Sequence, residues 1–338
     1  MSIDTQEITK PKASTKGMSK QQFLKAYRTM RTIRDFEDKI SEQFMKGNIP
    51  GFLHLYSGQE AVAAGLCLLL DDDDYVISTH RGHGHCIAKG GDVGGMMKEI
   101  MAKQGGLCDG KGGSMHIADF DKGMLGANAI VGGGPPIIVG AALSAKTLGT
   151  DRVGVAFGGD GSSNQGTTFE AMNLAVVLKL PTIFLFENNG YGEGTHASYA
   201  VGSKDIASRA QGFGMPAYKV DGTDLFAVYE LCKQVVEHCR QGKGPVTIEA
   251  SVPRFKGHFE GDPQAYRGDG EIERLMKEQD CLEIARKAAV KKKLANAKEL
   301  DAIDEEIGSY INEVTEAALA APAPGDDELL MNVYSSAY

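Results

Sequence analysis

The chain has 338 residues, 42% of them hydrophobic, and a formal net charge of −9 at pH 7. A chain of this length holds one large α/β domain or two smaller ones, and its negative charge argues against binding to nucleic acid or to an anionic membrane surface. No apolar stretch approaches the roughly 20 residues that a membrane-spanning helix needs.

The N-terminal residues 1–18 predict a disordered leader on a cytoplasmic protein. They lack the apolar core of a secretory signal, and they include Asp4 and Glu7 but no arginine, unlike a mitochondrial transit peptide. The six cysteines, at positions 67, 86, 108, 232, 239 and 281, form no CxxC pair. This spacing argues against a redox motif or a zinc ribbon and fits a reducing compartment.

Helices and strands alternate along residues 19–270, which predicts an α/β domain with a doubly wound, mostly parallel sheet and helices on both faces. The first helix, over 19–46, has Ser19 and Gln22 as a capping box at its start. Further helices are expected over 58–70, 136–148, 165–179 and 225–240, and strands over 74–79, 153–157, 182–186, 217–220 and 246–252. A helical extension over 271–322 and an acidic, aromatic tail over 323–338 complete the chain.

The stretch from residue 152 to residue 191 places polar side chains after two apolar strands. Asp160 follows the first strand within Gly-Asp-Gly, and Asn189 follows the second within Asn-Asn. Because ligands collect at the carboxyl ends of parallel strands, we expect these two residues to meet at one edge of the sheet. A carboxylate and an amide oxygen suit Mg²⁺ or Ca²⁺, with a diphosphate supplying further oxygens.

The residues after Asp160 indicate how such a diphosphate would be held. Gly161, Ser162 and Ser163 are expected to open the next helix, so that their N–H groups point at the anion. Two other interpretations compete with this one. The motif also fits an ordinary turn with a helix cap, or a dinucleotide-binding turn, although the third glycine of that pattern is replaced by Asn164.

Histidines gather in the run HRGHGHC over residues 80–86. Three histidines and a cysteine suggest a transition-metal site, but neighbours along a strand point to opposite faces and crowd a single tetrahedral ion. Arg81, at a strand end beside glycine, is better suited to grip a diphosphate. His54 lies between Leu53 and Leu55, and by itself it indicates a core histidine with satisfied hydrogen bonds.

Several motifs occur in a fixed order: GFLHLYSGQEA (51–61), THRGHGH (79–85), GKGGSMHI (110–117), Gly-Asp-Gly with Asn-Asn (159–189) and GHFEGDPQAYR (257–267). Together they resemble the alpha subunit of the two-chain decarboxylating component of 2-oxo acid dehydrogenase complexes. The resemblance covers residues 19–267. It fades at Asp280-Cys281-Leu282, where relatives usually have Asp-Pro-Ile.

The resemblance implies a thiamine diphosphate-binding fold whose cofactors are thiamine diphosphate and Mg²⁺. Asp160, Asn189 and the carbonyl group of Tyr191 would hold the metal, and His54 and His258 would be catalytic. The implied cofactor contacts are Phe52 as a wall of the substrate pocket, His80, Arg81, the backbone at Ala129 and Val131, and Gly161, Ser162 and His258. His80 and Ala129 stand where many relatives have tyrosine and glycine.

The resemblance also implies partners and a substrate. In such enzymes the carboxylic acid near the aminopyrimidine ring comes from a beta subunit, which implies an α2β2 heterotetramer that passes a two-carbon unit to a lipoyl-bearing acyltransferase. Residues 80–90, 116–128 and 257–267 look closer to acetoin dehydrogenase members than to pyruvate dehydrogenase members, so we expect acetoin, with pyruvate as the alternative. A catalytically inactive scaffold and a nicotinamide-dependent oxidoreductase are the other hypotheses.

Overall fold

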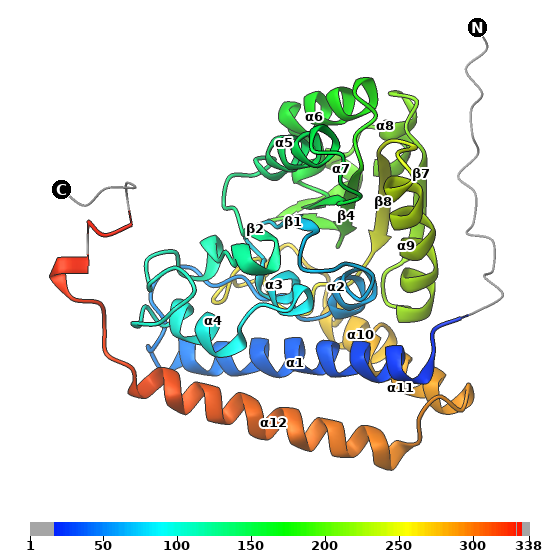
Figure 1. Ribbon diagram of the computed structural model, residues 1–338. Helices are drawn as coiled ribbons and strands as arrows, with labels where there is room; N and C mark the ends of the chain where they lie inside the picture. Colours follow the sequence, from blue (N-terminus) through cyan, green and yellow to red (C-terminus); the bar gives the residue numbers. More distant parts are fainter. Residues whose placement is uncertain (1–16, 329, 333–338) are drawn as a thin grey trace, which may run out of the picture.

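The computed structural model describes residues 17–328 and 330–332. Residues 1–16 of the predicted leader, and residues 329 and 333–338 of the predicted tail, lie outside the described part of the chain. Figure 1 shows a central sheet with helices packed around it and two long helices, α1 and α12, running side by side along one end. No described helix combines the length and the apolarity that crossing a membrane requires.

The main sheet confirms the predicted doubly wound architecture. Within the described residues it has six strands in the order β2-β1-β3-β4-β8-β7, and all neighbours are parallel. These strands are β1 (Tyr75–Ile77), β2 (Met124–Gly126), β3 (Gly154–Gly159), β4 (Thr182–Asn188), β7 (Ala217–Asp221) and β8 (Val246–Ser251). After β4, an antiparallel hairpin pairs β5 (Tyr191–Gly192) with β6 (Thr195–His196).

The sheet is buried on both faces, and alternate residues of one strand enter two different cores. In β3, Val155 and Phe157 pack into the core shared with α2 (Glu60–Cys67) and α9 (Leu225–Arg240). Ala156 packs into the core shared with α5 (Gly134–Thr147), α6 (Gly166–Val177) and α8 (Ile206–Gln211). Burial on both faces is why the central strands are continuous apolar runs rather than alternating patterns.

Helices α1 (Lys20–Met45) and α12 (Ala297–Ala320) form an outer layer against the α2 side of the molecule. The predicted capping box at Ser19 and Gln22 is present, and the Tyr27 hydroxyl donates to Asp304 across the pair at 3.0 Å. The remaining helices are α3 (His83–Lys89), α4 (Val93–Ile100), α7 (Ala197–Ala200), α10 (Glu271–Glu278) and α11 (Cys281–Lys291). The division of the chain at residue 270 into a domain and an extension stays a prediction.

The carboxyl ends of β3, β4 and β8 lie at one edge of the sheet and position the candidate site. Gly159 of β3 is paired with Glu187 of β4, and Asn188 of β4 is paired with Ser251 of β8. The residues that follow these pairs therefore leave the sheet together. Ligands of open parallel sheets bind at such an edge.

Candidate active site

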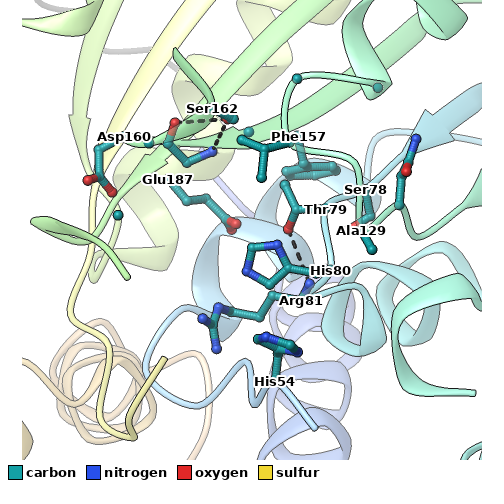
Figure 2. Close-up of a pocket in the computed structure, with 18 of the residues that line it drawn as sticks. His54, Ser78, Thr79, His80, Arg81, Ala129, Phe157, Asp160, Ser162 and Glu187 are labelled. Atoms are coloured by element: carbon teal, nitrogen blue, oxygen red, sulfur yellow. Dashed lines mark hydrogen bonds between the residues drawn. The ribbon is translucent and has the colours of Figure 1, made fainter. Parts of the chain in front are cut away.

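A cavity of about 410 Å³ opens at this edge of the sheet. Figure 2 shows Asp160 and Ser162 towards one end of it and His54 towards the other, with Glu187 and His80 between them. The structure brings together every predicted site residue except Phe52. Those that line the cavity are His54, His80, Arg81, Ala129, Val131, Asp160, Gly161, Ser162, Asn189, Tyr191 and His258.

Asp160, Asn189 and Tyr191 form what we call the oxygen end of the cavity. Asp160 is 2% exposed, and its carboxylate accepts a hydrogen bond from the backbone N–H of Asn189. The Asn189 side-chain oxygen accepts from the backbone N–H of Tyr191 at 3.3 Å. The carbonyl oxygen of Tyr191 accepts from Arg254 at 3.3 Å. Carboxylate, amide and carbonyl oxygens are the ligands that Mg²⁺ and Ca²⁺ prefer.

Two glycines in contact hold the oxygen end together. A Cβ atom added to Gly192 would lie 3.1 Å from the Cα atom of Gly161 and 3.8 Å from Oδ2 of Asp160. A side chain at either position would therefore push the β5–β6 hairpin away from the end of β3. The sequence places glycine at both positions, so Tyr191 stays beside Asp160.

The charge on Asp160 is incompletely compensated in the protein alone. Burial raises the pKa of its carboxyl group to about 6, against a smaller opposing effect of its hydrogen bonds and of the Arg254 charge. A divalent cation next to a carboxylate stabilises the ionised form. The raised pKa is therefore what is expected of a metal ligand before the metal binds.

Two buried guanidinium groups, Arg81 and Arg254, line the same cavity. Arg81 donates to the backbone carbonyls of Leu55 and His258, and Arg254 donates to the Tyr191 carbonyl and, at 2.6 Å, to the Tyr266 hydroxyl. Within the described part of the chain, neither forms a salt bridge with a carboxylate.

Burial, and then the charge of Arg254, lowers the pKa of Arg81 to about 9. Nε of Arg254 is buried without a hydrogen-bond partner among the described residues. Buried cations without anionic partners are costly in an empty protein. Together the two groups suit a bound anion such as a diphosphate.

His54, His80 and His258 form what we call the imidazole end. Their ring centroids lie 4.6 Å apart for His54 and His80 and 5.1 Å apart for the other two pairs. Burial, followed by the charge of Arg81, lowers the pKa of His54 to about 3, that of His80 to about 2 and that of His258 to about 4. All three rings are therefore neutral near pH 7.

The other histidines of the run 80–86 are separated from this cluster. α3 begins at His83, so this part of the run is helical and not a strand as the sequence argument assumed. His83 contacts Glu37 at 3.0 Å and Ser114 at 2.9 Å. His85 contacts Ser78 at 2.7 Å and Glu187 at 3.3 Å. The two rings are thus held by different partners and do not share one ion.

Three details differ from the sequence-based expectations. Ser162 belongs to a short 3₁₀ turn (Ser162–Asn164), and α6 starts only at Gly166, so Gly161 does not open the helix directly. His54 is not a satisfied core histidine, because its Nδ1 atom is buried without a partner among the described residues. Phe52 does not line the cavity; it is 61% exposed and packs edge-on against Phe259. Its part as a pocket wall stays a prediction.

Sequence reasoning missed Arg254 and Glu187, which both line the cavity. Each follows the rule that identified Asp160, because each stands at or just beyond the carboxyl end of an apolar strand, β8 for Arg254 and β4 for Glu187. Glu187 accepts hydrogen bonds from Tyr56 and His85. Both residues could have been predicted from the sequence, because ligands of open parallel sheets bind at the carboxyl ends of the strands.

Comparison with known proteins agrees with this geometry. Residues 28–326 match the model of the family described as dehydrogenase E1 component. The alpha subunit of acetoin:2,6-dichlorophenolindophenol oxidoreductase from Cupriavidus necator is 51% identical over 94% of this chain and 96% of that protein. Its counterpart from Bacillus subtilis is 49% identical over 95% and 96%. The pyruvate dehydrogenase E1 component subunit alpha of Rhizobium meliloti is 40% identical over 93% and 90%.

The chain therefore belongs to the dehydrogenase E1 component family. This membership confirms the predicted class, a thiamine diphosphate-dependent oxidoreductase. The relatives are alpha subunits by name, which agrees with the prediction that this chain works with a second type of subunit.

Proposed function

We propose that this chain is the alpha subunit of an α2β2 dehydrogenase that cleaves acetoin and passes the two-carbon unit to lipoamide on an acyltransferase. The observation that carries the proposal is the convergence of Asp160, Asn189 and Tyr191 around one cavity with two buried arginines that form no salt bridge among the described residues. The identity of about half to two acetoin:2,6-dichlorophenolindophenol oxidoreductase alpha subunits supports the substrate.

The residues present fit thiamine diphosphate and Mg²⁺. The oxygen end supplies the donor set of a hard cation, and Arg81 and Arg254 supply positive charge for the diphosphate. The loop with Ala129 and Val131 lines the same cavity and is available to the ring portion of the cofactor. When bound, thiamine diphosphate supplies a nucleophilic carbon and an electron sink for breaking the bond next to a carbonyl group.

Two of the chain's own residues contribute proton transfer. His54 and His258 are neutral at pH 7 and lie in contact with each other, so either ring is able to accept a proton. Nδ1 of His54 has no hydrogen-bond partner among the described residues. Cleavage of acetoin releases a proton from its hydroxyl group as the carbon–carbon bond breaks, whereas loss of CO₂ from pyruvate releases none. Neutral imidazoles suit the first reaction in particular.

The proposal requires a beta subunit, because the carboxylic acid expected beside the aminopyrimidine ring is assigned to that chain. The purified alpha chain alone is expected to be inactive, and activity is expected once the beta chain is added. Full turnover by the alpha chain alone would refute the proposed division of labour. The cytoplasmic location stays a prediction.

The substrate is tested with the complete α–β enzyme, Mg²⁺, thiamine diphosphate and a dye acceptor. We expect kcat/KM for acetoin to exceed that for pyruvate. A tenfold preference for pyruvate would reverse the assignment and favour the pyruvate dehydrogenase alternative, which the 40% identity to the Rhizobium protein supports. Calorimetry with Mg²⁺ and thiamine diphosphate separates both from an inactive scaffold, which would bind neither.

A further inference from the structure

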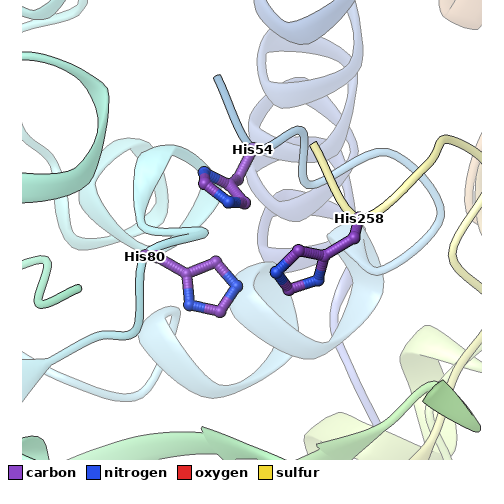
Figure 3. Close-up of side chains that lie close together, drawn as sticks. All are labelled: His54, His80 and His258. Atoms are coloured by element: carbon purple, nitrogen blue, oxygen red, sulfur yellow. The ribbon is translucent and has the colours of Figure 1, made fainter. Parts of the chain in front are cut away.

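We propose that His54, His80 and His258 form a binding site for a borderline transition-metal ion, best suited to Zn²⁺. The site is separate from the oxygen end, where Mg²⁺ is proposed. Among the described residues, these three histidines each offer a ring nitrogen, and the three nitrogens lie within 4.8 Å of one another. Figure 3 shows the rings converging from three separate stretches of chain.

Among the residues that the structure describes, no hydrogen bond occupies the ring nitrogens of the cluster. Within the described residues, the three rings contact one another, and the rings of His54 and His258 also contact Phe259. His54 Nδ1 is buried without a hydrogen-bond partner. His83 and His85, by contrast, both use their ring nitrogens in hydrogen bonds. A free, neutral imidazole nitrogen is the form that binds a metal, since no proton has to be displaced.

The backbone that carries the cluster is held in place by Arg81. This residue follows His80 directly in sequence, and its guanidinium donates to the carbonyl of Leu55, next to His54, and to the carbonyl of His258 at 3.0 Å. Asp262 adds a second restraint by accepting from the backbone N–H of His258 at 2.7 Å. One buried side chain thus ties together the three loops, which makes the site preorganised.

The distances fit a tetrahedral ion after small ring rotations. Zinc–imidazole bonds are about 2.0–2.1 Å long, which places two nitrogens of a tetrahedral site about 3.4 Å apart. The longest nitrogen separation in the cluster is at most 4.8 Å, so it has to shrink by no more than about 1.4 Å. Three protein ligands leave the fourth position open towards the cavity, where water or a carboxylate completes the shell.

The strength of metal–nitrogen bonds, rather than charge, sets the selectivity of the site. Arg81 and Arg254 disfavour any cation there, although the cavity is also lined by the carboxylates of Asp160, Glu187 and Glu193. Binding at the imidazole end therefore depends on the strength of metal–nitrogen bonds, which is high for Zn²⁺, Ni²⁺ and Cu²⁺ and low for Mg²⁺ and Ca²⁺. The two ends of one cavity should sort two classes of cation, and an ion at the imidazole end blocks the rings proposed for proton transfer.

The test uses the full-length chain purified with its beta partner, without thiamine diphosphate and in buffer with excess Mg²⁺ to fill the oxygen end. Titration calorimetry with ZnCl₂ is expected to show one Zn²⁺ per alpha chain. His80→Phe and His258→Phe should each weaken binding by on the order of a hundredfold or more, since even outer-shell partners of a metal change affinity by 10–100-fold. His116→Gln is the matched control, because this histidine is exposed and lies outside the cavity lining.

Each outcome decides the proposal. Absence of Zn²⁺ binding to the wild type overturns it, as does binding that survives the cluster substitutions or is lost only in Asp160→Asn. If a variant fails to fold, the wild type is loaded with Co²⁺, whose visible spectrum distinguishes tetrahedral nitrogen coordination from octahedral oxygen coordination. A purely octahedral spectrum also rejects the site. Because binding is read directly, failure here leaves the proposed acetoin cleavage untouched.

Discussion

Burial shifts pKa values in opposite directions at the two ends of the cavity. At the oxygen end burial raises the pKa of Asp160 to about 6, so the empty site resists a negative charge. At the imidazole end burial lowers the pKa of His54 to about 3, so the empty site resists a positive charge. One end is completed by a cation and the other stays neutral, ready to accept a proton or a metal with nitrogen affinity.

The largest effect is expected when the oxygen end loses its carboxylate. In Mg²⁺ buffer, Asp160→Asn should weaken thiamine diphosphate binding by about 3 kcal/mol or more, over a hundredfold, because a charge-assisted ligand of the metal is removed. Calorimetry on the α–β complex measures this. Asp151→Asn, a change at an exposed carboxylate, serves as the control. Equal affinity for thiamine diphosphate in Asp160→Asn and in the control would contradict a metal site at the oxygen end.

The same substitution should have the opposite effect on the stability of the cofactor-free chain. Since the folded pKa of Asp160 lies above its unfolded value of 3.8, the folded state holds a proton that the unfolded state releases. Stability is therefore full below about pH 4 and is lost as pH rises through about 6. At 1.36 kcal/mol per pKa unit, the loss above pH 6 is about 2–3 kcal/mol.

Asp160→Asn should recover most of that stability at pH 8 and about half as much at pH 5. Denaturant unfolding in a chelating buffer at both pH values is the measurement. Added Mg²⁺ should stabilise the wild type and leave the variant unchanged. A variant that is less stable than the wild type at pH 8 would show that the Asp160 charge is already compensated by the protein.

The imidazole end should show the reverse dependence on pH, and its change between pH 7 and pH 5 should be smaller than the total change expected for Asp160. The folded pKa of His54 lies below its unfolded value of 6.5, so its contribution is present above pH 6.5 and is lost as pH falls towards 3. Between pH 7 and pH 5 the wild type should lose about 1–2 kcal/mol through this residue. His54→Gln should lose correspondingly less over that interval, whereas His116→Gln should behave like the wild type. Parallel curves for all three proteins would mean that His54 remains solvated.

The sequence identified the oxygen end because its signal is local. Asp160 and Asn189 follow two long apolar strands, and the structure pairs those strands directly. The bounds of α9 and the presence of β3, β4, β7 and β8 were predictable for the same reason, since long apolar or amphipathic runs have a clear period. Two short elements were not predicted from the sequence. β2 has only three residues within a glycine-rich region, and α4 contains Gly94 and Gly95.

The imidazole end could not be predicted from local sequence patterns. His54, His80 and His258 come from three loops, and the contacts that join them run through Arg81 to the carbonyls of Leu55 and His258. No periodicity or motif spacing in the sequence predicts a hydrogen bond between residues 81 and 258. Family resemblance named the three histidines one by one but not as a cluster. The run of residues 80–86 placed His80 with His83 and His85, which the fold separates.

The smallest effect, and the sharpest test of whether the two ends are independent, concerns Gly192. A Cβ there meets the Cα atom of Gly161 at 3.1 Å, so Gly192→Ala has to move the hairpin that carries Tyr191 by a few tenths of an ångström. We expect Mg²⁺-dependent thiamine diphosphate binding to weaken by about tenfold, or roughly 1.4 kcal/mol. Gly202→Ala is the matched control in the same segment, because an added Cβ at Gly202 meets nothing within 4 Å.

Zn²⁺ titration of both variants should be unchanged, since no histidine of the cluster lies on the β5–β6 hairpin. If Gly192→Ala also weakens Zn²⁺ binding, the two ends are mechanically coupled through the residues between them and must be treated as one site.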